Sequence, residues 1–267
     1  MKSLALIAFR KLYKSRVFWI MLFLYALSMS GMLFGVEAFI NKIASNASKN
    51  SPIPIPDFSL YEFPYIWHNL SYLAGFLKLF PALILMVFVA ADYSYRTNRL
   101  QMMMGLSREA YFLTQVFMVL ALALFSAVLL IIWAIVQGFV HSTDLSLSSI
   151  FGKSYFVAAY FLEVLAFLSF ALLIVTLLRK SGLSIIAFSI SYLAIEPIIR
   201  FYVPEVVAQN LPFKSIGSLI DVPNTSLMQL FGFNFRTYID LWDLVITLIY
   251  TVLFLIFTFW IIKRRDL

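Results

Sequence analysis

The sequence predicts an all-α, polytopic membrane protein because of its composition and its six long apolar segments. Of its 267 residues, 63% are hydrophobic and 12% are charged, whereas a soluble domain is close to half apolar and a quarter charged. A membrane span needs about 20 mostly apolar residues. The candidate spans are residues 17–40, 70–91, 111–139, 154–178, 183–199 and 240–262. We therefore expect a single transmembrane domain over residues 1–267.

The basic residues predict which ends of the spans face the cytoplasm. They gather before the first span, between the second and third, between the fourth and fifth, and after the sixth: Lys2, Arg10, Lys11, Lys14, Arg16, Arg96, Arg99, Arg108, Arg179, Lys180, Lys263, Arg264 and Arg265. Short connections rich in Lys and Arg remain cytoplasmic. Both termini should therefore be cytoplasmic, in a multi-pass protein of the cell (inner or plasma) membrane. The net charge of +7 then reflects topology, and no nucleic-acid partner is expected.

The first 16 residues are too short and too polar to span a membrane. On a helix, Leu6 and Phe9 share one face, while Arg10 and Lys11 share another. Such a helix can lie in the membrane interface with its cations near anionic lipid headgroups. We expect residues 1–16 to form this interfacial helix. A signal peptide is the alternative, but the following apolar run has no convincing small-residue cleavage site.

The fifth span is expected to be short. Residues 183–195 give about 13 apolar residues, a helix of about 20 Å, less than the hydrocarbon core of about 30 Å. The segment that follows, residues 197–239, is apolar but interrupted by prolines: Pro197, Pro204, Pro212 and Pro223. We expect one or two short re-entrant or interfacial helices there, on the outer side, since broken backbone is tolerated only against protein or a water-filled cavity.

Residues 92–110, between the second and third spans, carry the strongest functional signal. Residues 93–104 can form about three helical turns, with Arg96 and Arg99 one turn apart. An apolar side is supplied by Leu100, Met103 and Met104, and methionine is common on surfaces that bind other proteins. A generic basic loop would explain the arginines but not the methionines. We therefore predict a cytoplasmic helix that docks a partner.

The residues after this helix predict a tight corner. Gly105 suits a C-terminal cap, because glycine adopts the left-handed conformation at no steric cost. Ser107 suits the N-cap of the next helix, and Glu109 would lie in its first turn, where the helix dipole favours an anion. The chain should therefore form a short cytoplasmic helix, turn, and re-enter the membrane.

This segment resembles a known family signature. Asp92-Tyr-Ser-Tyr-Arg-Thr97 followed by Gly105-Leu-Ser-Arg108 is similar to the acid-x-x-x-[Gly/Arg]-Thr…Gly-x-Ser-Arg pattern of the type-2 permeases of ATP-binding cassette (ABC) exporters. In that family the segment is a coupling helix that docks on an ATPase subunit. The interfacial helix, the six spans and the broken segment before the last span resemble the same family. Two departures are Asp92, where Glu is commoner, and Arg96, where Gly often precedes the Thr.

The resemblance implies that the chain is the permease subunit of an ABC exporter. Its partners would be two copies of an ABC ATPase subunit, a second permease protomer that supplies the other half of the pathway, and the lipid bilayer. ATP and Mg would be bound by the ATPase, with no cofactor in this chain. The residues expected to dock and couple are Asp92, Arg96, Thr97, Arg99, Met103, Gly105, Ser107 and Arg108.

Four ionisable residues lie in or beside apolar runs: Lys78, Glu163, Glu196 and Arg200. Charges there are costly and often functional. We expect Lys78 to extend outward to the membrane surface, and Glu196 and Arg200, four apart on a helix, to pair and stabilise the start of the outer segment. Glu163, without an evident partner, is the stronger candidate for a pathway or subunit interface. Glu196 and Arg200 are the alternative candidates.

Catalytic and metal sites are not expected. The chain has two histidines and no cysteine, and it contains neither an HExxH motif nor a phosphate-binding Gly-x-x-x-x-Gly-Lys loop. Two alternatives to an exporter subunit remain. An ATP-independent secondary transporter or channel would need paired ionisable residues near the membrane centre, and the expected outward placement of the charges argues against it. A non-transporting membrane scaffold would share the topology but would not need the docking helix.

Overall fold

The computed structural model describes residues 13–49, 60–223 and 236–265, and within these ranges the chain forms helices and no strand. Six helical segments are long and apolar enough to cross a membrane: Arg16–Val36, Ile66–Ser94, Arg108–His141, Leu147–Leu178, Ser181–Tyr202 and Leu241–Arg264. The predicted fold class, an all-α polytopic membrane protein, is confirmed. The predicted interfacial helix over residues 1–16 lies outside the described residues, apart from its last four.

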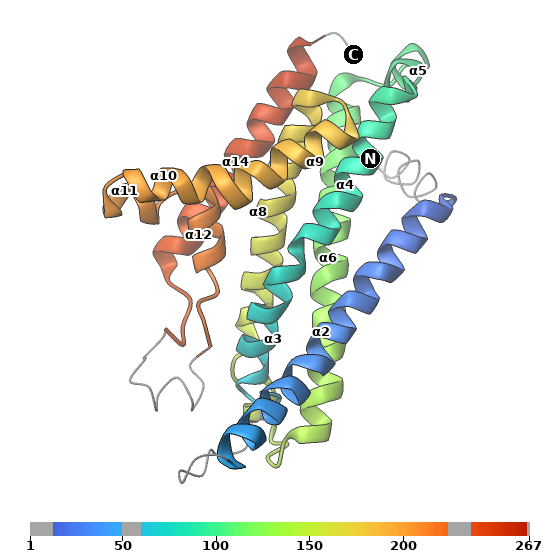
Figure 1. Cartoon of the computed structure of the whole chain (residues 1–267). Helices are drawn as coiled ribbons and strands as arrows, with labels where there is room; N and C mark the ends of the chain where they lie inside the picture. Colours follow the sequence, from blue (N-terminus) through green and yellow to red (C-terminus); the bar gives the residue numbers. More distant parts are fainter. Residues whose placement is uncertain (1–12, 50–59, 224–235, 266–267) are drawn as a thin grey trace.

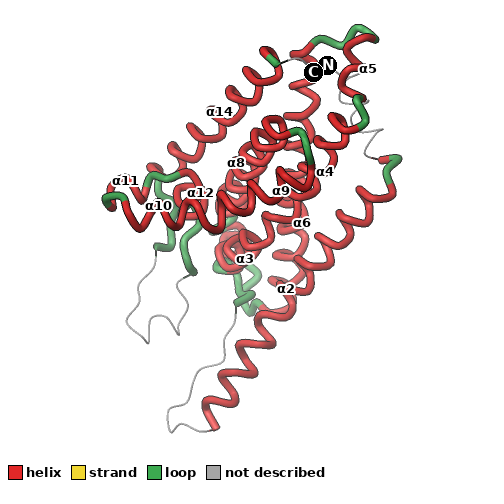
Figure 2. Tube along the Cα trace, turned by 45° about the horizontal axis from the view of Figure 1, so that its top comes forward, coloured by secondary structure: helices red, strands yellow, loops and turns green. Residues whose placement is uncertain are grey.

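Several spans are built from more than one helical piece (Figures 1 and 2). The elements are α2 (Arg16–Lys49), α3 (Ile66–Gly75), the 3₁₀ turn η1 (Phe76–Lys78), α4 (Leu79–Ser94), α5 (Thr97–Met103), α6 (Arg108–His141), α7 (Leu147–Phe151), α8 (Tyr155–Leu178), α9 (Ser181–Ile190), the π-helical segment η2 (Ser191–Ile195), α10 (Glu196–Tyr202), α11 (Glu205–Gln209), α12 (Pro212–Ser218) and α14 (Leu241–Arg264). The 3₁₀ turn interrupts the second span, and the π-helical segment interrupts the fifth.

Helix α8 is the centre of the bundle. It packs against α3, α4, α6, α9, α12 and α14. Its small residues Ala159, Ala166 and Ala171 are buried, as are Ala123 and Ala134 of α6. Small residues let helix backbones approach closely, which matters in a membrane because lipid tails are as apolar as the side chains they would replace. Close packing therefore holds the bundle together around α8.

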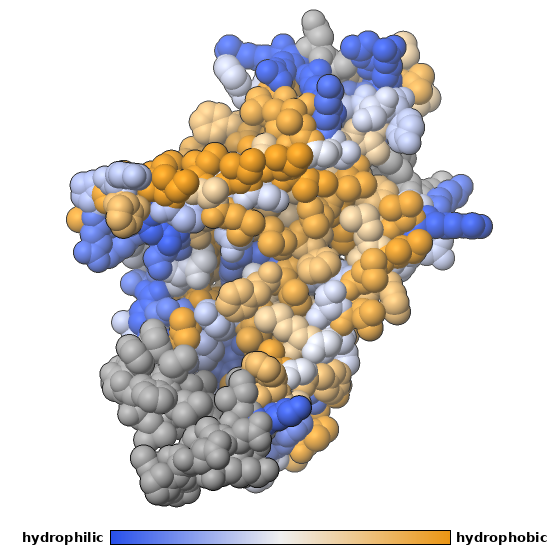
Figure 3. Space-filling model, viewed as in Figure 1, coloured by the Kyte–Doolittle hydropathy of each residue, from blue (hydrophilic) through white to orange (hydrophobic). Residues whose placement is uncertain are grey.

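One end of the bundle carries a cluster of basic residues. Helix α5, the start of α6 and the end of α14 lie together there (Figure 1), and the space-filling view shows a hydrophilic cap at this end above an apolar surface (Figure 3). We call it the α5 end. The opposite end holds α7 and the residues that precede α3.

The expectation of a short fifth span is wrong. Helices α9 and α10, joined by η2, continue for 22 residues to Tyr202, about 33 Å at 1.5 Å per residue. Pro197 does not end the helix, since it is the second residue of α10 and the preceding π-helical segment η2 has already altered the hydrogen-bond ladder. The segment crosses the direction of α8 and α14 and projects from the bundle (Figures 1 and 2).

The described part of residues 197–239 contains α11 and α12 after the end of α10. These short helices fold back onto α14. The hydroxyl of Tyr250 donates a hydrogen bond of 2.7 Å to the backbone oxygen of Asn210, and Thr247 donates one of 3.3 Å to that of Ser215. The broken segment is thus held against the last span.

Candidate functional site at the corner between the second and third spans

The buried carboxylate of Asp92 joins three helices at the α5 end. Its Oδ1 accepts a hydrogen bond of 2.9 Å from the hydroxyl of Thr97, and its Oδ2 accepts one of 3.3 Å from the amide of Gln115 in α6. The Thr97 hydroxyl also lies 3.2 Å from the backbone oxygen of Asp92. An acid and a threonine five residues apart therefore fix the turn from α4 to α5.

Arg96 provides the turn itself. Its backbone is left-handed, with φ 54° and ψ 24°, so α4 ends at Ser94 and α5 begins at Thr97. The predicted continuous helix over residues 93–104 is therefore wrong, and α5 has only seven residues. The left-handed region is unfavourable for a residue with a Cβ, which explains why glycine would suit this position.

The predicted corner after α5 is present. Gly105 has φ +94°, and its N–H donates to Met102 while the N–H of Leu106 donates to Gln101, both at 3.0 Å. This pair of bonds is a Schellman cap. Ser107 then accepts a hydrogen bond of 3.1 Å from the N–H of Ala110, as the N-cap of α6. Each end of α5 is thus fixed by a specific contact.

The two left-handed residues predict opposite effects of substitution. We expect Arg96→Gly to raise the free energy of unfolding by up to about 1 kcal/mol, and Gly105→Ala to lower it by about 1–2 kcal/mol, because only glycine takes positive φ without strain. Gly182→Ala is the control, since Gly182 lies in α9 with open space around it. SDS titration in mixed micelles measures the change. A Gly105→Ala variant as stable as wild type would contradict the assignment.

The outward side of α5 is apolar. Met103 and Met104 are 76% and 79% exposed, and Leu100 is also exposed. Arg96 and Arg99 are exposed as well. Large apolar side chains at a charged end of a bundle do not face lipid tails, so this side of α5 is a candidate contact surface for another protein.

A basic hollow of about 430 Å³ separates the α4–α5 corner from the α8–α9 corner. It is lined by Tyr93, Ser94, Arg96, Asn98, Arg99, Leu178, Arg179 and Lys180. Arg179 has a left-handed backbone, with φ 59°, and its guanidinium lies 5.4 Å from the centre of the Tyr93 ring. From the sequence alone, Arg179 and Lys180 serve only to predict which side of the membrane their connection faces. Their proximity to Arg96 follows from tertiary packing.

Arg108 has contacts within the chain. Its guanidinium donates to the backbone oxygens of Lys263, at 2.6 Å, and Arg265, at 3.2 Å. These oxygens lie at the C-terminal end of α14. A cation close to the last carbonyls of a helix stabilises that end. Arg265 in turn donates to the backbone oxygen of Leu177 at 2.9 Å. Arg108 therefore ties the start of α6 to the end of α14, and Arg265 ties the end of α14 to the end of α8.

The expectation that Lys78 extends outward is wrong. Its ammonium lies 2.6 Å from Oε1 of Glu163, and both side chains are about 95% buried. The ammonium also lies 5.1 Å and 5.7 Å from the ring centres of Phe167 and Tyr192. A buried cation is tolerated when a counter-charge and aromatic faces replace its hydration. The expected outward placement of the charges is the argument against an ATP-independent transporter. Because Lys78 and Glu163 are paired inside the bundle, that argument does not hold.

A glycine makes room for the Glu163 carboxylate. A Cβ on Gly75 would lie 3.3 Å from Oε1 of Glu163, so α3 approaches this carboxylate closely. The 3₁₀ turn that ends at Lys78 follows directly on Gly75, and Tyr192 lies in the π-helical segment η2. Two irregular helix segments therefore meet at one ion pair. Such irregularities often occur at hinges and functional sites.

Glu196 pairs with Arg200 as expected, at 3.3 Å, but its main contacts are with the backbone. The buried carboxylate accepts hydrogen bonds from the N–H groups of Phe213, at 2.7 Å, and Lys214, at 2.6 Å. These N–H groups belong to the first turn of α12. Glu196 thus fastens α12 to α10, and Arg200 lies at the rim of this contact.

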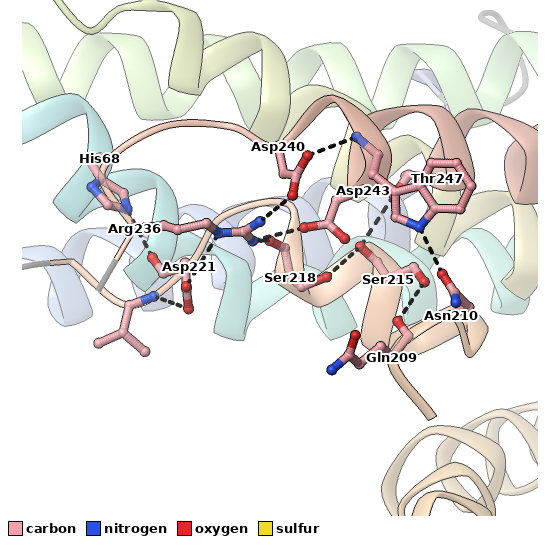
Figure 4. Close-up of polar contacts among 12 residues, drawn as sticks. His68, Gln209, Asn210, Ser215, Ser218, Asp221, Arg236, Asp240, Asp243 and Thr247 are labelled. Atoms are coloured by element: carbon pink, nitrogen blue, oxygen red, sulfur yellow. Dashed lines mark hydrogen bonds and ion pairs between the residues drawn. The ribbon is translucent and has the colours of Figure 1, made fainter. Parts of the chain in front are cut away.

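Arg236 forms a second polar cluster, between α12 and the start of α14 (Figure 4). It contacts carboxylate oxygens of Asp221, Asp240 and Asp243 at 3.6, 3.2 and 2.8 Å, and donates to the backbone oxygen of Ser218 at 2.7 Å. Burial lowers the pKa of Arg236, but hydrogen bonding and attraction to Asp243 and its neighbours outweigh this, so the pKa is raised. The cluster joins the end of the broken segment to α14.

The structure brings most of the predicted docking residues together around α5, while Glu163 lies within the bundle and Glu196 near α12. Within the described ranges, no group of three or more His, Asp or Glu side chains is arranged to hold a metal ion. Comparison with models of known protein families and with curated protein sequences finds no match. The functional assignment therefore depends on the residues and their geometry.

Proposed function

We propose that this chain is the permease subunit of an ABC exporter in the cell membrane, and that α5 docks on a separate ATPase subunit. In this proposal the α5 end and both termini are cytoplasmic. The basic residues of the short connections support this orientation, because Arg96, Arg99, Arg179, Lys180 and Lys263 lie at one end of the bundle.

The observation that carries the proposal is the construction of α5. A connection that only had to be basic would need neither the Asp92–Thr97 hydrogen bond nor the Gly105 and Ser107 caps. Together these contacts hold a two-turn helix in one orientation with its apolar side exposed. A helix fixed at both ends can transmit force to the spans on either side, which a flexible loop cannot.

The contacts also suggest how movement would pass into the membrane. Displacement of α5 would move α4 and α6 together, since Asp92 bonds to Thr97 and Gln115. Arg108 would extend this movement to α14. A second permease protomer would supply the other half of the pathway, and ATP hydrolysis would occur on the partner. This chain would provide docking and transmission and no catalysis.

Acidic substitutions on α5 test the docking role. We expect Leu100→Asp with Met103→Asp to reduce at least tenfold the ATPase recovered when the tagged chain is purified from native membranes, since two charges would be buried in an apolar interface. The matched control is Leu145→Asp with Leu147→Asp, which are similarly exposed near α7. ATP hydrolysis and identification of a phosphate-loop subunit measure recovery. If wild type brings down no ATPase, or if both variants retain it, the proposal fails.

The buried Lys78–Glu163 pair favours a second candidate, a secondary transporter or channel that works without ATP. Paired charges inside a membrane often belong to ion or proton pathways. This candidate requires transport by the purified chain alone in vesicles. Transport should then be abolished by replacing both members of the pair with neutral residues.

A further inference from the structure

The basic hollow at the α5 end concentrates positive charge from two distant parts of the sequence. Four of its lining residues are cationic, Arg96, Arg99, Arg179 and Lys180, and none carries a carboxylate. Buried Asp92 lies next to this hollow but is engaged by Thr97 and Gln115. The ends of α4 and α8 contribute about half a negative charge each. Cationic side chains therefore predominate in the lining of the hollow.

The backbone is strained where it places two of these cations. Among the described residues, the non-glycine positions with positive φ are Arg96 and Arg179, and both line the hollow. Each follows the end of a helix, where glycine would be the unstrained choice. An arginine kept in a strained position points to a role for its side chain.

The position of the hollow favours a lipid ligand. It lies where α4 and α8 end and α9 begins, at the charged ends of three apolar helices. Tyr93 and Leu178 provide apolar surface beside the cations, as expected at a membrane interface. The exposed apolar side of α5 is instead formed by Leu100, Met103 and Met104, none of which lines the hollow.

We propose that this hollow binds the phosphate group of an anionic phospholipid headgroup. The forked guanidinium groups of arginine match phosphate oxygens in charge and geometry, and a basic pocket between helix ends is a recognised form of headgroup site. The bound lipid would bridge the α4–α5 and α8–α9 corners. This inference goes beyond the proposed function and does not depend on an ATPase.

Retention of lipid by the purified full chain tests the proposal. The protein is delipidated in neutral detergent, and phosphatidylglycerol or phosphatidylcholine is added and counted by native mass spectrometry. Wild type should retain phosphatidylglycerol in preference. Arg179→Gln with Lys180→Gln should weaken its binding roughly 25-fold, at about fivefold for each cation near the headgroup. The control, Lys263→Gln with Arg264→Gln, removes the same charge at the α5 end but outside the hollow, and should change binding about twofold or less.

The outcomes separate a site from diffuse attraction. Equal losses in both double variants, or equal retention of the two lipids by wild type, would overturn the proposal. Displacement of the lipid by millimolar inorganic phosphate would identify a site for soluble phosphate compounds and would also count against a lipid. If the Arg179 and Lys180 variant does not fold, Arg99→Gln with Lys180→Gln tests the same hollow at two exposed positions.

Discussion

Replacing Lys78 by methionine alone is expected to lower the free energy of unfolding by about 3–5 kcal/mol, as is replacing Glu163 by glutamine alone. Each single variant leaves one buried charge without its partner. The double variant should lose much less, because neutral side chains of similar size need no counter-charge. This non-additive pattern is expected from a buried ion pair 2.6 Å apart.

SDS titration of the two single variants and the double variant in mixed micelles measures the coupling. Glu205→Gln is the control, since Glu205 is exposed and its removal should change stability by about 0.5 kcal/mol or less. A double variant as unstable as the sum of the single variants would show that the two side chains do not act as a pair.

The same variants separate structure from transport. A pair that only holds α3 and η1 to α8 would leave transport intact in the stable double variant. A pair that belongs to an ion or proton pathway would lose transport while stability is kept. The second result would favour the ATP-independent transporter over the exporter subunit.

The parts of the structure that the sequence predicts are local. The six apolar segments are found within a few residues because span length and hydropathy are properties of single stretches of chain. The caps at Gly105 and Ser107 are predictable for the same reason, since each depends on neighbouring residues. The pairing of Glu196 with Arg200 also follows from helical spacing.

The failures of prediction all involve partners distant in sequence or competing local effects. Lys78 and Glu163 are separated by 85 positions, so the expected extension of Lys78 to the surface has no sequence signal against it. Arg179 lines the same hollow as Arg96 because two corners pack together. At Pro197, the usual rule that proline ends a helix is overridden by the preceding π-helical segment. Charge and proline patterns therefore locate elements but not their contacts.

Replacing Glu196 by alanine is expected to lower the free energy of unfolding by about 2–4 kcal/mol. The substitution removes the acceptor for the backbone N–H groups of Phe213, which is buried, and Lys214, which is half-buried. A fully buried donor left unpaired costs about 1–3 kcal/mol, and a half-buried donor costs less. The first turn of α12 would lose its connection to α10. The effect should be centred on α11 and α12, which hydrogen exchange of their backbone amides can resolve.

Two further substitutions determine which contact of Glu196 matters. Arg200→Ala removes the ion pair but keeps both backbone bonds, and its side chain is 39% exposed, so the loss should be about 1 kcal/mol or less. Glu196→Gln keeps one acceptor oxygen and should be intermediate. If Arg200→Ala were as damaging as Glu196→Ala, the ion pair rather than the cap on α12 would be the main contribution. If Glu196→Ala lowers the free energy of unfolding more than Arg200→Ala does, Glu196 belongs to the residues that hold the broken segment together. A role for Glu196 in a transport pathway would then need a separate observation.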